Sequence, residues 1–310
     1  MPATLRQLRE RRQSVAATMK ITRAMELIAA SRVSRAQQRA RRCEPYNDEL
    51  VQAVSMLATH ADAVHPLTTE PEKSLRAGVL VISADRGMAG AYNANIFRLA
   101  EGLLEALEKE GKGIELYTCG KKAHDYFSYR DVPIVRSWEG FSFRPHYANA
   151  KEIGETLIAE FLQQTNDDEG VDELHVVFTR FHSLVSQQTQ IMRLLPLVVV
   201  EGESEENSQR VHGEVTHTEK PAETEYFFEP SPEAVLDTLL PLYIINQLRF
   251  ALMESAASEL AARQQAMHSA TDNAKQLIDT LTRDANQARQ AEITQEINEI
   301  VGGAGALTAG

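Results

Sequence analysis

The sequence predicts an α/β protein in which long N- and C-terminal helices form an antiparallel coiled coil and a mostly parallel sheet domain is inserted between them. Three observations support this prediction. The segment from Leu242 to Val301 contains no proline or glycine, and neither does the segment from Leu5 to Arg42. Between the two, short apolar segments alternate with helical patterns, which is typical of a sheet covered by helices.

The C-terminal helix is bracketed by Pro241 before it and by Gly302 and Gly303 after it. At about 1.5 Å per residue it would be roughly 90 Å long, so part of it must extend beyond a compact domain. The residues that would face a partner helix, called the seam below, are spaced by three and four. This gives a period near 3.5, which is typical of a helix coiled around another helix. They are Leu260, Met267, Ala274, Ile278, Leu281, Ala285 and Ala288, with Gln264 and Thr271 filling the gaps. Many are small or polar, so such a pair should be only modestly stable alone, and an ordinary bundle helix is the alternative.

The N-terminal helix supplies the partner. Thr4 can cap its start, and its seam residues again step by threes and fours or their sums: Leu5, Leu8, Val15, Met19, Thr22, Ala29 and Val33. Pro45 lacks an amide proton and clashes with the preceding turn, so we expect it to bend or interrupt the helix. The helix should then resume between Tyr46 and Ala63. Residues 1–70 and 232–310 are therefore predicted to form the coiled coil.

Residues 75–230 are predicted to form a Rossmann-like, mostly parallel sheet domain with helices on both faces. The expected strands are Ala77–Ser83, Ile114–Cys119, Val132–Val135, Glu173–Phe181 and Gln188–Val200, the last two forming a hairpin. The expected helices are Asn93–Glu110, Lys121–Tyr129 and Tyr147–Gln164. The segment from Glu201 to Glu225 is polar and acid-rich, with few apolar residues to bury, and we expect a mobile or disordered loop there.

The charge of the chain is distributed unevenly. The 310 residues carry a net charge of −12, yet the first 44 residues hold eleven Lys or Arg against three Glu. A basic segment on an acidic protein suits an acidic partner, and nucleic acid, anionic lipid and an acidic protein loop all meet that description. A solvated helix face is the alternative.

Other features bear on the compartment. No run of apolar residues reaches the length of a membrane span, and Met1–Lys20 lacks the apolar core of a secretory signal. Cys43 and Cys119 have no metal-ligand spacing around them, so we expect both to be reduced and the chain to be intracellular.

Evidence for catalysis is weak. The glycine turn from Ala84 to Gly90 could cradle a phosphate at a helix N-terminus, but it lacks the GxGxxG spacing, and no GxxxxGK[ST] motif occurs. None of the nine histidines pairs with another ligand at metal-binding spacing. Ser83 and Ser183 have no GxSxG context. We therefore predict no catalytic residue, metal site or cofactor.

Four segments together resemble the gamma subunit of F-type ATP synthases. They are KITRAMELIAASR (Lys20–Arg32), SADRGMAGAYN (Ser83–Asn93), SATDNA (Ser269–Ala274) and ARQAEITQEINEIVGGAGA (Ala288–Ala306). The last is the most specific for the family, with Ile293, Thr294, Glu296, Glu299, Gly303 and Ala304 in their expected places. Two departures are visible. Met88 and Ala89 stand where the family more often has Leu and Cys, and the acidic loop from Glu201 to Glu225 looks longer than usual.

This resemblance implies a rotor subunit of a bacterial enzyme. In the family the coiled coil turns inside a hexamer of alpha and beta subunits, and the sheet domain sits against the epsilon subunit and the ring of c subunits. The chain would transmit torque during proton-driven ATP synthesis or hydrolysis without an active site or cofactor. It would be a peripheral protein at the cytoplasmic face of the cell membrane, touching the membrane only through the c ring, and would not bind nucleic acid.

The resemblance also assigns residues. Contacts to beta would be made by Lys20, Arg23, Met25, Arg32, Arg86, Arg289, Gln290, Thr294 and Glu296. The tip, which turns in an apolar sleeve, would include Ile297, Ile300 and Val301. The side facing the c ring and epsilon would include Tyr226, Phe227 and Phe228. Two alternatives remain at this stage, namely a coiled-coil adaptor for an acidic protein and a nucleotide-binding α/β enzyme that uses the glycine turn.

Overall fold

A computed structural model describes residues 4–60, 65–71, 73–163, 170–200, 214–216, 229 and 231–308. The chain divides into two compact units. Residues 1–30 and 263–310 form one, called the helical unit below, and residues 31–262 form the other, the sheet unit. The two long helices each contribute to both units.

Helix α1 spans Leu5–His60. Thr4 caps its start as predicted, because the Gln7 amide donates to Thr4 Oγ1 (3.4 Å) and the Leu8 amide to the Thr4 carbonyl (3.0 Å). Of the two outcomes expected at Pro45, a bend or an interruption, the interruption does not occur, since the helix runs through this residue. Asn47 and Leu50, just after this proline, are buried in the sheet unit. Their packing outweighs the cost of about 3 kcal/mol that a proline imposes on a helix interior.

Helix α5 spans Pro232–Thr308, beyond both ends of the proline- and glycine-free segment Leu242–Val301. Ser231 caps it, since the Ala234 amide donates to Ser231 Oγ (3.3 Å), and a proline fits the first helical position that follows such a cap. Pro241 lies inside the helix instead of before it. The glycine pair at 302 and 303 does not end it either; each glycine costs only about 1 kcal/mol in a helix.

Helix α5 contains a long apolar stretch. Between Glu233 and Ile300 it is long and apolar enough to cross a membrane by length and composition, with a mean hydropathy of 1.2 over its most apolar stretch. Within the described residues it is the one helix of this kind, and 56% of that stretch is buried inside the protein. A core helix meets the same test, so this is weak evidence for a membrane span.

The sheet unit contains a five-stranded sheet with the order β3-β2-β1-β4-β5. The strands are β1 (Arg76–Ile82), β2 (Gly113–Cys119), β3 (Ile134–Trp138), β4 (Glu173–Phe181) and β5 (Gln187–Leu195). The first four are parallel and β5 is antiparallel to β4, which confirms the mostly parallel sheet and its hairpin. The predicted strand Gln188–Val200 is two strands. β5 ends before Pro196, which cannot donate to the ladder, and β6 (Val198–Val200) pairs with β7 (Glu214–Thr216).

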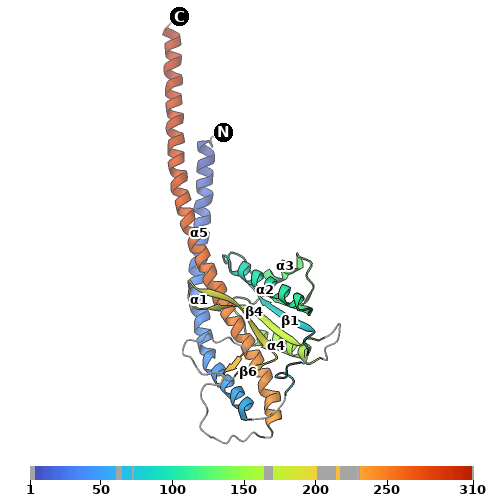
Figure 1. Cartoon of the computed structure of the whole chain (residues 1–310). Helices are drawn as coiled ribbons and strands as arrows, with labels where there is room; N and C mark the ends of the chain where they lie inside the picture. The colour runs from blue at the N-terminus through green and yellow to red at the C-terminus, as the bar shows by residue number, and fades with distance from the viewer. Residues whose placement is uncertain are drawn as a thin grey trace. The chain divides into compact units, whose positions relative to one another are not determined.

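Helices cover both faces of this sheet (Figure 1). α2 (Tyr92–Lys109) and α3 (Lys121–Ser128) lie on one face, while α4 (Tyr147–Leu162) and the sheet-unit parts of α1 and α5 lie on the other. Alternate residues of β1 therefore enter different cores, with Val79 and Val81 packed under α2 and α3 and Leu80 and Ile82 under α4 and α5.

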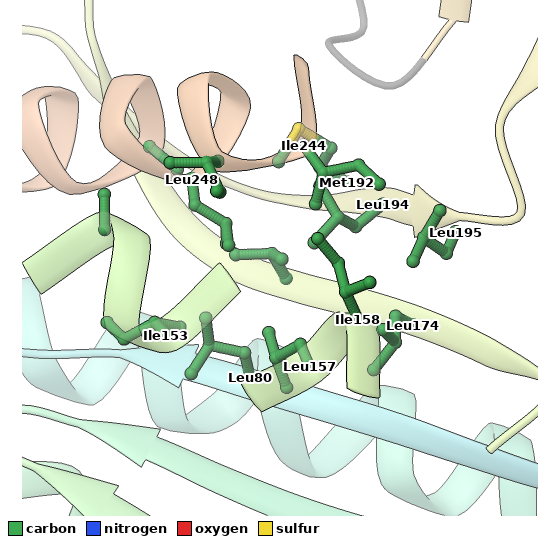
Figure 2. Packing of buried hydrophobic residues seen from close by; sticks show 14 of the residues in the cluster. Leu80, Ile153, Leu157, Ile158, Leu174, Met192, Leu194, Leu195, Ile244 and Leu248 are labelled. Atoms are coloured by element: carbon green, nitrogen blue, oxygen red, sulfur yellow. The ribbon is translucent and has the colours of Figure 1, made fainter. Parts of the chain in front are cut away.

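Figure 2 shows the second of these cores, which contains Leu80 of β1, Ile153 and Leu157 of α4 and Leu248 of α5. α4 approaches α5 closely at Gly154, because a Cβ there would lie 2.7 Å from Ile245 Cγ1. This close contact holds α5 against α4, which covers the sheet.

In the helical unit α1 and α5 run antiparallel. Thr22 Oγ1 lies 2.9 Å from Thr271 Oγ1, and four residues further along α1, Glu26 meets His268, which is earlier in α5. The predicted seam is largely confirmed, since Ala29, Met267, Thr271, Ala274, Leu281 and Ala285 are buried. α5 continues past the first residues of α1 (Figure 1).

Candidate functional site

The contact residues predicted on α1 differ in how exposed they are. Lys20 is exposed and Met25 is partly buried. Arg23 is 53% exposed, but its Nη1 donates to both carboxylate oxygens of Glu26 at 2.9 Å. Arg23 is therefore held by its own helix and is available to a partner only through the rest of its guanidinium.

Glu26 occupies a seam position that was not among the predicted seam residues. It lies four residues after Thr22 and three before Ala29, so the spacing of threes and fours already included it. Its residue is 8% exposed, and His268 Nδ1 lies 3.1 Å from Glu26 Oε1. Burial alone would raise the pKa of Glu26, but the hydrogen bonds from Arg23 and His268 outweigh it, and the pKa is lowered. We call Thr22, Glu26, His268 and Thr271 the polar layer.

An exposed apolar ridge accompanies these charges on α1. Ile21, Leu27 and Ile28 are 61%, 57% and 52% exposed. Ile21 and Ile28 are seven residues apart, two helical turns, and so lie on one line along the helix. Large apolar side chains gathered on a surface mark a contact site for another protein. The ridge is not among the features predicted from the sequence, because the charge and the seam of this segment gave the predictions there.

The predicted contacts near the end of α5 form a second, separate group. Arg289, Gln290, Thr294 and Glu296 are all exposed, and Thr294 Oγ1 donates to the Gln290 carbonyl (2.9 Å) within the helix. Because Thr22 faces Thr271 and the helices are antiparallel, Arg289 falls opposite the start of α1, near Thr4. It is about 27 Å along the pair from Thr271. The α1 group and the α5 group are therefore two contact sites.

Beyond Arg289 the helix α5 stands alone within the described part of the chain. All residues from Arg289 to Ile300 are exposed, including Ile297 (54%) and Ile300 (71%). The helix includes Val301, but its side chain is outside the described set. Exposed isoleucines on a single helix need an apolar surface to cover them.

Two predicted contact residues belong to the sheet unit. Arg32 is exposed, and its guanidinium carbon lies 5.1 Å from the centre of the Phe143 ring, a cation–π contact. Arg86 is exposed on the turn between β1 and α2, near Met88, which has a positive φ of 62°. The predicted residues Tyr226, Phe227 and Phe228 lie outside the described residues, as does most of the acidic loop from Glu201 to Glu225.

The turn that invited a nucleotide-binding interpretation is bound by the protein's own groups. Asp85 Oδ1 accepts from the Lys121 amide (3.1 Å) at the first residue of α3, and Asp85 Oδ2 accepts from the Ser142 amide (2.9 Å). Ser83 Oγ accepts from the Ala123 amide (2.8 Å). The Asp85 carboxylate thus occupies the N-terminus of α3, whereas the helix that follows the turn directly is α2. The turn ties β1 to the loops after β2 and β3.

At the other end of the strands, where β1, β2 and β4 begin, buried charged side chains form ion pairs. Lys112 Nζ lies 2.7 Å from Glu173 Oε1, and the Glu173 oxygen is 3.5 Å from His175 Nε2. Burial raises the pKa of Glu173, but the His175 ring and the Lys112 ammonium outweigh it and lower the pKa to about 2. Arg76 pairs with Glu115 (2.7 Å), which also accepts from the Tyr117 hydroxyl (2.7 Å). These pairs join β1, β2 and β4.

Within the described ranges, no three His, Cys, Asp or Glu side chains are grouped to hold a metal ion. Cys43 is partly buried and Cys119 fully buried, and both are free thiols. Burial raises the pKa of the Cys119 thiol, which makes it less reactive.

Comparison with known proteins extends over the whole chain. Residues 4–307 match a family model described as ATP synthase. The ATP synthase gamma chain of Nocardioides sp. is 53% identical, over 99% of this chain and 97% of that protein, and that of Cutibacterium acnes is 52% identical, over 99% and 98%. A chain in the Euglena gracilis mitochondrial ATP synthase, solved with OSCP, F1 and the c ring, has the same fold. Its TM-score is 0.66 at 20% identity, covering 99% of this chain and 95% of that one.

Proposed function

The chain belongs to the ATP synthase gamma chain family and is a central-stalk rotor subunit of an F-type ATP synthase, and we propose that it transmits torque between the c ring and the catalytic beta subunits. The observation that best supports this mechanism is the helical unit. It combines a thin, partly polar seam with exposed apolar and basic side chains, as a shaft needs when other subunits surround it.

We propose two contact sites for beta. One is the α1 site with Lys20, Arg23 and Met25, to which the ridge of Ile21, Leu27 and Ile28 adds apolar area. The other is the α5 site with Arg289, Gln290, Thr294 and Glu296. A single shaft presents different residues to each beta subunit around it, so a face that binds one conformation more tightly shifts that subunit toward it. Exposed charges suit such contacts, since they exchange water for a partner at little net cost.

The remaining assignments rest on the family resemblance, to which exposure adds support for Arg32, Arg86, Ile297 and Ile300. Arg32 and Arg86 are proposed as further beta contacts on the sheet unit. Ile297, Ile300 and Val301 are proposed to turn in an apolar sleeve at the end of α5. Tyr226, Phe227 and Phe228 are proposed to face the c ring and epsilon. The subunit is proposed to be non-catalytic and peripheral, at the cytoplasmic face of the cell membrane.

The experiment is to express the chain with alpha and beta subunits of the same organism and to ask whether they co-purify as one complex whose ATPase activity depends on the chain. Dependence of the activity on the chain is the expected result. A chain that remains free would favour an adaptor, and saturable nucleotide binding by the chain alone would favour an enzyme.

The residue assignments are tested by a second experiment, which uses the membrane-bound complex. Arg86→Ala with Gln290→Ala should reduce ATP-driven proton pumping, because both side chains are exposed and are proposed to bind beta. The matched control is Arg98→Ala with Gln276→Ala, two exposed residues of the same types on α2 and α5. Equal pumping in the two double variants would reject the contact assignment and leave the rotor assignment in place.

A further inference from the structure

The last residues of β4 extend past the end of β1, and α5 binds the backbone groups that β1 leaves there. The β1–β4 pairing ends at Val177, whereas β4 continues to Phe181. The Thr179 amide donates to Ser255 Oγ (3.3 Å), and the Thr179 carbonyl accepts from Ser258 Oγ (3.2 Å). The Phe181 amide donates to Glu254 Oε2 (2.9 Å). Side chains of one helix thus continue the hydrogen bonding of the sheet.

The two bonds of Thr179 are buried, the Phe181 bond is partly buried, and a third element takes part. Thr179, Ser255 and Ser258 are 2%, 3% and 0% exposed. The Tyr92 hydroxyl at the start of α2 donates to the Ser255 carbonyl (3.2 Å). We call these residues the β4–α5 clamp: Tyr92, Thr179, Phe181, Glu254, Ser255 and Ser258. All of them belong to the sheet unit.

The clamp differs mechanically from the other contacts of α5 with the sheet. Ile244 and Leu248 lie in an apolar cluster with residues of α4 and β5 (Figure 2). Apolar burial is non-directional, so it resists separation of the helix from the sheet more than rotation of the helix in place. Hydrogen bonds weaken steeply when misaligned, and a buried amide that loses its partner is left unsatisfied. Three bonds from one turn of α5 to two residues of β4 therefore oppose both sliding and rotation.

We propose that the β4–α5 clamp is the point at which torque passes between the sheet unit and the C-terminal helix. The proposal rests on the rotor function and specifies where within the subunit the load is borne. α5 is continuous from Pro232 to Thr308, so the clamp residues are on the same helix as the proposed beta contacts Arg289 and Gln290.

The experiment measures torsional stiffness in the assembled complex of this chain with alpha and beta. The hexamer is fixed to a surface, and a bead is attached to a biotinylated cysteine introduced by Tyr129→Cys, a highly exposed position of the sheet unit. A chain without this substitution shows whether Cys43 or Cys119 takes up label. The width of the bead's angular distribution in the paused complex reports the stiffness between hexamer and sheet unit.

Ser255→Ala with Ser258→Ala removes two clamp hydroxyls and keeps good helix-forming residues. We expect a broader angular distribution than in the parent, with ATPase activity of the unloaded complex retained. Ser258→Ala alone, which keeps the Ser255 bond, should broaden it less and serves if the double variant does not fold.

The control is Thr238→Ala with Thr280→Ala. These two hydroxyls of α5 donate to carbonyls of their own helix, at Ala234 (3.2 Å) and Gln276 (3.0 Å). Their removal should leave the distribution unchanged. Equal widths in the clamp and control variants would overturn the proposal. Failure of the parent chain to assemble would instead reject the rotor function, so the two failures are distinguishable.

Discussion

The sheet unit and the helical unit bury their apolar residues in different ways. The sheet unit has a core on each face of its sheet, with fully buried Tyr117, Phe127 and Phe178 and paired charges at the sheet edge. The helical unit has one row of mostly small residues, interrupted by the polar layer, and α5 is exposed from Arg289 to Ile300. The sheet unit should therefore be stable on its own contacts, while the helical unit relies on surfaces supplied by other subunits.

The largest expected effect is a loss of stability of the sheet unit when Gly120 is replaced. Its φ is +98°, and a Cβ there would lie 2.3 Å from the Ser83 carbonyl oxygen. Gly120→Ala should lower the free energy of unfolding by about 3–5 kcal/mol, from backbone strain plus overpacking. Urea unfolding followed by fluorescence of the single tryptophan, Trp138, measures it. Gly111→Ala is the control, because its φ is +76° with open space around it, and it should cost about 1 kcal/mol. Equal losses would show that the contact with Ser83 is unimportant.

A matched pair of truncations compares the two cores directly. Leu157→Ala in the sheet unit should cost about 4 kcal/mol, because rigid neighbours on all sides leave a cavity. Leu281→Ala in the helical unit should cost about 2 kcal/mol or less, because the seam is thin and open to solvent on both sides. Both leucines are buried, and thermal unfolding followed by circular dichroism measures both losses. A loss at Leu281 as large as that at Leu157 would contradict the difference between the units.

Acid should weaken the sheet unit through Glu173. Its pKa is about 2 in the folded chain against an ordinary 4.5, so its stabilising effect is present above about pH 4.5 and is lost as the pH falls toward 2. The loss should be on the order of 2–3 kcal/mol. Free energies of unfolding measured between these pH values should show a slope that Glu173→Gln removes. Glu105→Gln, an exposed glutamate with a 3.7 Å ion pair, is the control and should retain the slope.

The smallest effect concerns the polar layer. Glu26→Gln removes the charge that faces Arg23 and His268, and should destabilise the helical unit by about 1 kcal/mol or less, since the surrounding charges are largely solvated. Because the pKa of Glu26 is lowered, its contribution is present above its ordinary range and is lost as the pH falls. Hydrogen exchange of amides in residues 18–30 measures the local opening. Exchange that is unchanged in the variant at neutral pH would show that the layer does not hold the helices together.

The glycine and proline rules located the elements of the sheet unit well and failed on the long helices. The boundaries of β2, α3 and β4 differ from the prediction by one residue or less. In α1 and α5 Pro45, Pro241 and the glycine pair at 302 and 303 all lie inside helix. Local preferences of about 1–3 kcal/mol decide short elements, but in a long helix the packing of many neighbours outweighs them. The start of α5 was nevertheless readable from Ser231-Pro232-Glu233, which is a capping signal.

The residues of the candidate site also differ in whether the sequence predicts their surroundings. Exposure of Lys20, Arg289 and Gln290 followed from the sequence, because charged and polar residues outside a seam face solvent. Glu26 and the clamp serines did not, since a polar residue at a seam or sheet edge is acceptable only when a particular partner from a distant segment satisfies it.

By itself the sequence determined the kind of protein this is. The order helix, sheet domain, helix, the antiparallel pairing and the family resemblance all follow from patterns within single segments, because periodicity and motifs are local properties. Only the tertiary structure decided that Asp85 occupies the N-terminus of α3, that Arg23 is held by Glu26, and that α5 binds the free edge of β4. Each of these joins atoms that the chain separates or that several neighbours compete for, and only the packed fold determines which partner each atom has.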